Sequence, residues 1–262
     1  MTDSADGGGT LTVTFAPRPG AAGAGRMLAA QTRMELRLLL RNGEQVGLTL
    51  VIPLLLEFFF NLPLLYSLDG RRIDFVVPSV LALAVMSASF TGLAIGTGFE
   101  RKYSVLKRLG ATALSRRVLL LGKTCAVLLL QVLQAALICG FGLVLGWRPG
   151  GDPVWVVLLL ALGTFAFGGL GLLLAGAVRA EVTLAAANLI WLVLLFGGGI
   201  AIPLSKFGSA ADVLRFLPSA ALSNGLHIVL QDGGGFPVLS LATLLVWAAL
   251  ALPAAARWFS WE

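Results

Sequence analysis

The sequence predicts an all-α membrane protein with six transmembrane helices and an amphipathic helix ahead of the first. The first observation is composition, since 58% of the residues are hydrophobic, 12% are charged and the mean hydropathy is +0.91. Ordinary soluble domains carry about twice that charged fraction. The second is length, because 262 residues allow six spans of ~20 residues and leave no room for a large soluble domain. The third is that basic residues cluster beside the apolar runs.

The net charge of +6 fits a membrane protein better than a nucleic-acid-binding one. Basic residues that flank apolar spans are what the positive-inside bias requires, so we expect no nucleic-acid partner. The two cysteines, Cys125 and Cys139, lie in one predicted helix, about 21 Å apart along its axis and too far apart for a disulfide. With one histidine and no cysteine–histidine cluster in the sequence, we expect neither a metal site nor a catalytic site.

The N-terminal region divides into a tail and a helix. Residues 1–25 are rich in glycine, alanine, proline and small polar residues, which predicts a disordered cytoplasmic tail without a cleavable signal peptide. Residues 26–262 form the membrane domain, which begins with an amphipathic helix over 26–42. Arg33, Arg37 and Arg41 lie four apart on one face of this helix, while leucines supply apolar surface. Such a helix can lie in the membrane interface, and the alternative is a plain solvated helix.

Six apolar runs are long enough to cross a bilayer as helices. They are residues 46–65, 76–98, 124–146, 154–178, 182–202 and 237–256. In the third run, Gln131 and Gln134 share a helical face and need hydrogen-bond partners in the bilayer. Three consecutive glycines, 197–199, should weaken the fifth helix near its outer end. The fourth run carries a ridge of small residues that predicts close packing: Gly163, Gly168, Gly169, Gly171 and Gly176.

Few polar side chains interrupt the spans, and three of them are candidates for a translocation path. A carboxylate inside a span is costly and should face protein or water, which singles out Glu57 in the first span. Asn61 lies one turn further on the same face, and Asn188 lies inside the fifth span. The alternative for Glu57 is a structural carboxyl group near the outer interface, protonated or hydrogen-bonded.

A basic loop, residues 99–123, joins the second and third spans. Its sequence, FERKYSVLKRLGATALSRRVLLLGK, holds seven of the nineteen basic residues, which should keep it on the cytoplasmic side. Gly110 should end a helix within the loop, and Ser115 should cap a new helix that continues into the third span. Apolar residues recur there at near-helical spacing with charges between them, which indicates a structured docking element: Val105, Leu106, Leu109 and Leu114.

This loop resembles the cytoplasmic loop of the ABC type-2 permeases of the daunorubicin-exporter type. That family shows an acid, basic residues, a core of the form lkRL.aTplsr and an exit of the form llGK. The family's proline before the serine is Leu114 here, and its Glu-Gly-Thr is Arg-Lys-Tyr-Ser. The matching positions are Glu100, Leu106, Lys107, Arg108, Leu109, Ala111, Thr112, Ser115, Arg116, Gly122 and Lys123.

The resemblance implies a non-catalytic permease subunit that works with separate ATPase subunits. Two permeases, identical or paralogous, would pair side by side, and two cytoplasmic ATPase subunits that bind ATP and Mg would dock beneath them. The helix over 26–42 would be the family's interfacial elbow helix. The residues expected to contact the ATPase are Glu100, Arg101, Lys102, Lys107 and Arg108, with Leu106 and Leu109 on the packed side.

Residues 203–236 are partly apolar but too polar to span the membrane. The stretch FLPSAALSNGLHIVLQDG resembles the family's segment before the last span, which implies short re-entrant helices at this point. Leu217, Pro218 and Gly233 fit the family pattern, whereas His227 stands where the family often has arginine. His227 could sense pH, and the alternative is an interfacial hydrogen-bonding role.

Six spans place both termini on the cytoplasmic side of the cell membrane. Fourteen of the nineteen basic residues then lie inside and five outside, as the positive-inside bias requires. The favoured function is the permease subunit of an ABC exporter for a lipophilic or amphiphilic substrate, such as a drug or a lipid. A stand-alone secondary transporter would need several ionisable groups in the membrane, for which Glu57 is the clear candidate. A membrane scaffold or assembly factor is the third possibility.

Overall fold

A computed structural model describes residues 22–62, 72–112, 114–202, 204–231 and 235–259, and these ranges are helical with short connections. Almost all of the predicted cytoplasmic tail lies outside them, as does the end of the first predicted span. A π-helical turn, η1 (Ser87–Gly92), joins α3 to α4, and a 3₁₀ segment, η2 (Leu204–Ala210), precedes α9. The α-helices are α1 (Ala24–Arg41), α2 (Gly43–Asn61), α3 (Arg72–Met86), α4 (Leu93–Lys102), α5 (Val105–Gly110), α6 (Arg116–Val144), α7 (Pro153–Ala177), α8 (Ala180–Gly197), α9 (Ala211–Leu214), α10 (Pro218–Leu230) and α11 (Val238–Trp258).

Five helical segments of the described chain are long and apolar enough to cross a membrane. They are Arg72–Lys102, Arg116–Val144, Pro153–Ala177, Ala180–Gly197 and Val238–Trp258, which correspond to the last five of the six predicted spans. Two bent helix pairs raise the possible number to seven. The first combines α1 with the part of α2 from Val46 and bends by 70°, and the second combines Lys206–Leu214 with α10 and bends by 110°. The all-helical, multi-pass architecture expected from the sequence is therefore confirmed.

The local sequence sets several helix ends, among them the predicted Ser115 cap. Ser115 begins α6, since its hydroxyl oxygen accepts a hydrogen bond from the Val118 N–H at 3.3 Å. Asp152 caps α7 in the same way, through the Val154 N–H at 2.9 Å. The helix α8 ends within the glycine triplet, where Gly199 adopts a φ of +69° that side chains disfavour.

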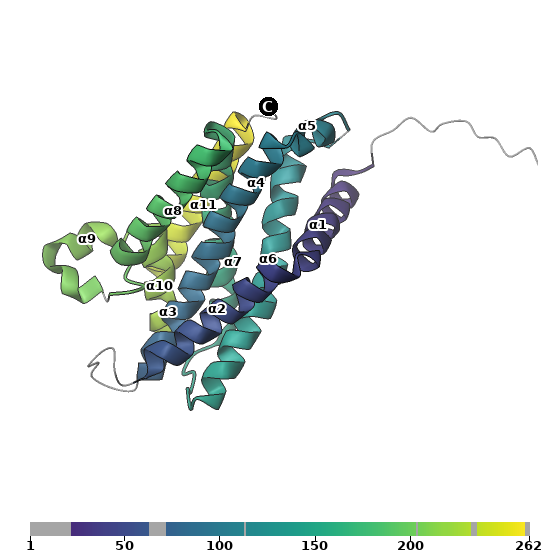
Figure 1. Cartoon of the computed structure of the whole chain (residues 1–262). Helices are drawn as coiled ribbons and strands as arrows, with labels where there is room; N and C mark the ends of the chain where they lie inside the picture. Colours follow the sequence, from purple (N-terminus) through teal and green to yellow (C-terminus); the bar gives the residue numbers. More distant parts are fainter. Residues whose placement is uncertain (1–21, 63–71, 113, 203, 232–234, 260–262) are drawn as a thin grey trace, which may run out of the picture.

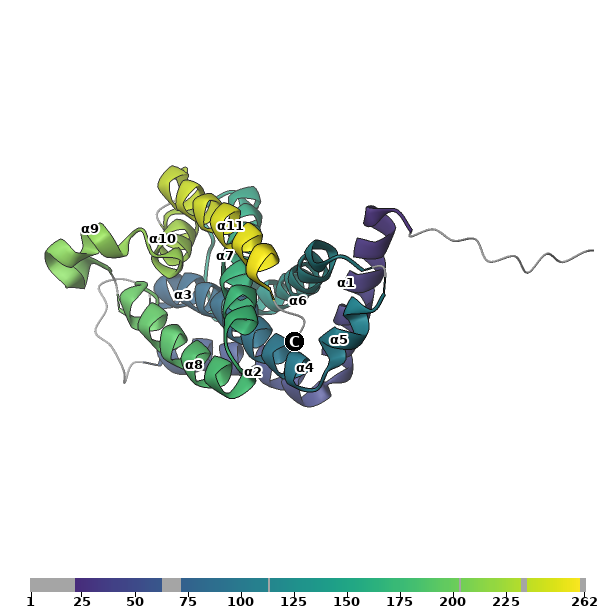
Figure 2. The same cartoon turned by 90° about the horizontal axis from the view of Figure 1, so that it is seen from above.

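The helix α7 packs at the centre of the bundle, with α11, α4, α3 and α10 around it (Figures 1 and 2). Its small-residue ridge makes this packing close, as predicted. A Cβ atom on Gly169 would lie 2.8 Å from the Ala251 Cβ of α11, and one on Gly171 would lie 2.5 Å from the Phe90 carbonyl oxygen of η1. Only glycine leaves room for such approaches, so the ridge brings the π-helical turn against α7.

The helix α1 stands beside α6 at the edge of the bundle, on the side away from α8 (Figure 2). Its arginines Arg33, Arg37 and Arg41 are exposed, as the amphipathic pattern predicts. Its opposite side buries two polar residues, Gln31 and Glu35. The helix is therefore joined to the bundle by polar contacts as well as by leucines.

Candidate functional site

A buried charge network joins three helices at the end of the bundle that carries α5. The Lys123 Nζ of α6 donates hydrogen bonds to the Glu35 carboxylate of α1 at 3.0 Å and to the Glu100 carboxylate of α4 at 2.8 Å. The Lys123 side chain is 3% exposed, Glu35 is 8% and Glu100 is 29%. Gln31 Nε2 donates a further hydrogen bond to Glu35 at 2.7 Å. One ammonium group thus holds two carboxylates, and with them α1 and α4, against α6.

The residues that follow Glu100 tie the same end of α4 to α7 and α8. Arg101 donates a hydrogen bond to the Gly176 carbonyl oxygen at 2.9 Å and another to that of Val178. These carbonyls end α7, where a cation is favoured by the helix dipole. Lys102 pairs with Glu181 at the start of α8, with a distance of 2.5 Å between Nζ and Oε1. Both members of this second pair are largely exposed.

The helix α5 lies across this end of the bundle and presents two different faces (Figure 1). Leu106 is fully buried in an apolar cluster with Leu119 and Leu120 of α6, and Leu109 packs against that cluster. Lys107 and Arg108 are exposed. A left-handed residue, Ser104 at a φ of +59°, makes the tight turn between α4 and α5. Motion of α5 is therefore bound to motion of α4 and α6.

The predicted ATPase-contact residues thus fall into two groups. Glu100 and Arg101 engage their own chain, and Lys102 does so while remaining accessible. Lys107 and Arg108 project from the exposed side of α5. Two apolar side chains are exposed beside them, Tyr103 at 67% and Val105 at 42%. Contact with an ATPase subunit stays a prediction for all of these residues.

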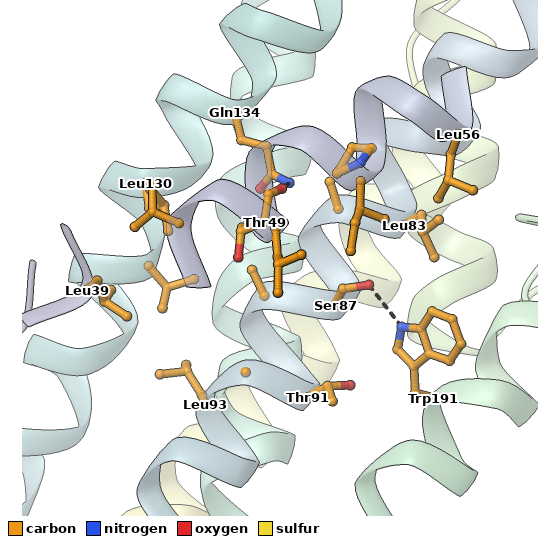
Figure 3. Close-up of a pocket in the computed structure, with 18 of the residues that line it drawn as sticks. Leu39, Thr49, Leu56, Leu83, Ser87, Thr91, Leu93, Leu130, Gln134 and Trp191 are labelled. Carbon is orange, nitrogen blue, oxygen red and sulfur yellow. Dashed lines mark hydrogen bonds between the residues drawn. The ribbon is translucent and has the colours of Figure 1, made fainter. Parts of the chain in front are cut away.

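A cavity of about 490 Å³ lies further along the bundle, between α2, α3, η1, α6 and α8 (Figure 3). Most of its lining is apolar, and leucines from five helices line it together with Trp191 of α8. The polar lining residues are neutral: Thr49, Ser87, Thr91, Gln134 and Asn188. Ser87 and Thr91 come from the π-helical turn, a feature often found at functional sites. Trp191 Nε1 donates a hydrogen bond to Ser87 Oγ at 2.9 Å, which is drawn in Figure 3.

Gln134 is held at the cavity by a defect in α2. Pro53 has no N–H, so the Thr49 carbonyl oxygen one turn earlier loses its usual helical partner. Gln134 Nε2 donates to that oxygen instead, at 2.8 Å. Because a carbonyl oxygen can only accept, the amide NH₂ of Gln134 must face Thr49 and its Oε1 must face away. That Oε1 and the Thr91 hydroxyl have no hydrogen-bond partner among the described residues.

A smaller cavity of about 200 Å³ shares Leu56, Leu83 and Trp191 with the first. It extends toward the far end of α3 and is lined there by Phe75 and Ser79. The two cavities together mark a largely apolar route along one side of α3.

The three predicted path residues do not come together. Asn188 lines the larger cavity, although its amide donates to the Leu184 carbonyl oxygen of its own helix at 2.9 Å. Glu57 is fully buried outside both linings, close to Gly142 of α6, and neither carboxylate oxygen has a hydrogen-bond partner among the described residues. Asn61 is half-buried and also outside both linings. A role for them in translocation stays a prediction.

His227 forms hydrogen bonds, which was one of the two interpretations of this residue. Its Nε2 lies 3.2 Å from Ser79 Oγ and its Nδ1 lies 2.9 Å from Gln231 Oε1, while its ring stacks on Phe75. It thereby connects α10 to α3. Nothing in this geometry bears on pH sensing.

Sequence reasoning missed Glu35 and underrated Lys123. Glu35 lies four residues after Gln31, so α1 carries a second polar stripe besides its arginines. A short helix with polar residues on two sides has to bury one of them when it packs. Lys123 stands inside an apolar run, seven residues after Arg116, and a lone cation there calls for a carboxylate partner. Both signals were present in the sequence.

These features define a class of protein: an all-helical, multi-pass membrane protein whose basic loop is built into the bundle at one end. A comparison with family models narrows the class. Residues 71–257 match the family described as ABC-2 family transporter protein, and the chain belongs to that family. It is therefore a membrane permease of ABC transport. Proteins of this family generally work with ATPase subunits, which supports the kind of partner expected from the sequence. A comparison with curated proteins found no match.

Proposed function

We propose that this chain is the membrane-spanning, non-catalytic subunit of an ATP-driven exporter, with ATP and Mg bound by two separate ATPase subunits. A second permease, identical or paralogous, would complete the complex in the cell membrane. The proposal takes α2 as the first of six spans, α9 and α10 as re-entrant helices, and both termini as cytoplasmic. The daunorubicin-exporter subtype rests on the loop motif alone.

The observation that carries the proposal is that α5 has one buried apolar side and one exposed basic side. The side of α5 that holds Leu106 is buried, whereas Lys107 and Arg108 face outward next to exposed apolar side chains. A partner that docks on the outward side would move α4 and α6 with α5, because Leu106 is buried in an apolar cluster that contains residues of α4 and α6. The Lys123 network would pass the same displacement to α1. A rigid connection of this kind can convert nucleotide-driven closure into movement between spans.

The cavities support a lipophilic or amphiphilic substrate. Their lining is mainly apolar, and the unpartnered acceptors, Gln134 Oε1 and Thr91 Oγ1, would suit a neutral molecule with a hydrogen-bond donor. Among the described residues that line the two cavities, none is ionisable. An ion-coupled secondary transporter would normally place such groups at its binding site, so this lining favours ATP-driven transport over that alternative.

The test reverses the outward charges and compares ATP hydrolysis with transport. Lys107→Glu/Arg108→Glu should leave the chain folded but separate ATP hydrolysis from substrate transport, or detach the ATPase subunits. The matched control is Lys206→Glu/Arg215→Glu, which reverses two exposed charges in the segment between α8 and α10, on the side of the bundle away from α1. Co-purification of the ATPase, its hydrolysis rate and substrate efflux are measured for each. Undiminished coupling in the first double variant would refute the docking role of α5.

The two alternatives predict different results in the same preparation. A secondary transporter would move substrate under a proton gradient without ATP and would purify without an ATPase. A scaffold would retain its partners and show no substrate flux.

A further inference from the structure

A groove of about 610 Å³ lies between α6 and α11, at the end of the bundle that carries α5. Two arginines line the groove, Arg117 in the first turn of α6 and Arg257 in the last turn of α11. The remaining lining is apolar and comes from both helices: Leu120, Leu121, Leu252, Pro253 and Ala256.

The two arginines of the groove differ from three nearby cations that have partners within the chain. Arg101, Lys102 and Lys123 are engaged by oxygen atoms of their own chain. Arg117 and Arg257 are exposed, and no described residue forms a hydrogen bond or ion pair with either. Both guanidinium groups are thus available at the polar end of a groove whose walls are apolar.

The orientation of the groove matches an amphiphile with an anionic head. Arg117 and Arg257 lie near the helix ends, while the apolar lining lies about one turn further toward the middle of α6 and α11. Arginine is well suited to phosphate, because its planar guanidinium can donate two parallel hydrogen bonds. Basic pockets between transmembrane helices are recurrent sites for anionic lipid headgroups.

We propose that this groove binds an anionic phospholipid, with its phosphate between Arg117 and Arg257 and one acyl chain along the apolar walls. The groove shares no lining residue with the cavities proposed for transport. The inference is therefore independent of the proposed transport function, and it holds for either membrane orientation.

The test measures lipid retention by the full chain with its native companions, purified in mild detergent. Phosphatidylglycerol and phosphatidylcholine with identical acyl chains are titrated separately, and bound lipid is counted by native mass spectrometry. The wild type should prefer phosphatidylglycerol. Arg117→Gln/Arg257→Gln should reduce that preference by about 30-fold, since each basic residue near an anionic surface contributes about a 5-fold factor. Arg117→Lys/Arg257→Lys keeps the charge and should retain most of the preference.

Two further variants separate this site from general surface charge. Arg37→Gln/Arg116→Gln removes two exposed arginines from the same end of the bundle but outside the groove, and should leave the preference within 2-fold. Leu121→Trp narrows the groove with both arginines in place, and should weaken phosphatidylglycerol binding. Equal losses in the two glutamine variants, or no preference in the wild type, would overturn the proposal. Glycerol 3-phosphate that competes as well as the lipid would overturn it too, by showing a site for free phosphate.

Discussion

Replacing Lys123 by methionine should destabilise the protein by about 3–5 kcal/mol, because the change strands a buried carboxylate. The Lys123 ammonium is 3.0 Å from Glu35 and 2.8 Å from Glu100, and its side chain is 3% exposed. Most of the cost comes from Glu35, whose side chain is 8% exposed and cannot reach water. Glu100 is 29% exposed and can be partly solvated, so it adds less.

The assay is thermal unfolding of the full chain in mild detergent, with Lys102→Met as the matched control. Lys102 also forms an ion pair, with Glu181, but the two side chains are 45% and 63% exposed. Its loss should cost far less than the loss of Lys123, as for other exposed pairs. A loss of 3 kcal/mol lowers the unfolding temperature by about 6–12 °C for a chain of this size. The two lysine variants should therefore separate clearly.

A double variant tests the stated cause. Glu35→Gln/Lys123→Met removes the stranded charge, and the new amide can still bond Gln31, which lies 2.7 Å from the present carboxylate. The double variant should be more stable than Lys123→Met alone. If it is not, or if Lys123→Met costs no more than Lys102→Met, the buried network does not hold α1 and α4 to α6.

Two further substitutions test the packing around the cavity. Gln134→Leu should cost about 1–3 kcal/mol in unfolding free energy, because it leaves the Thr49 carbonyl oxygen unpaired, and the cost should fall in a Pro53→Ala background, where the helix regains its own donor. An undiminished cost in that background would assign the effect to lost volume. Gly171→Ala should destabilise by about 1–3 kcal/mol, since its Cβ would lie 2.5 Å from a backbone oxygen of the π-helical turn. The control is Gly96→Ala, whose added Cβ would meet open space, and it should be neutral or stabilising in the same assay. Equal losses of stability in the two variants would contradict this packing.

The sequence predicted the helices well, because apolar length and capping residues act locally. The apolar run of α7, the Ser115 cap of α6 and the glycine triplet that ends α8 can each be recognised without knowledge of any neighbour. The π-helical turn Ser87–Gly92 could not be recognised in this way, since its residues are compatible with an ordinary α-helix. Its position depends on a tertiary contact, the close approach of Gly171 to its backbone.

The candidate site was predicted less completely, because partners between distant helices leave little trace in a single sequence. The loop residues were recognised as one basic cluster, but Lys123, Arg101 and Lys102 have separate partners on α1, α7 and α8. Likewise, Gln134 was expected to need a hydrogen-bond partner. The partner is the Thr49 carbonyl oxygen, which is available because Pro53 in the same helix, α2, has no N–H. Such pairings follow from packing and not from spacing along the chain.

The charges of the basic loop divide into two groups, and a permease coupled to an ATPase would need both at the same place. A loop held only by its ends would bend when a partner moves against it. Some of its charges must therefore form contacts with the rest of the chain. Glu100 and Arg101 do this, by fastening the end of α4 to α6 and α7. The outward charges, Lys107 and Arg108, then lie on a helix that is anchored to the bundle, because Leu106 is buried in an apolar cluster with residues of α4 and α6. Reversing the outward pair should thus alter coupling and spare stability, whereas breaking the Lys123 network should lower stability first.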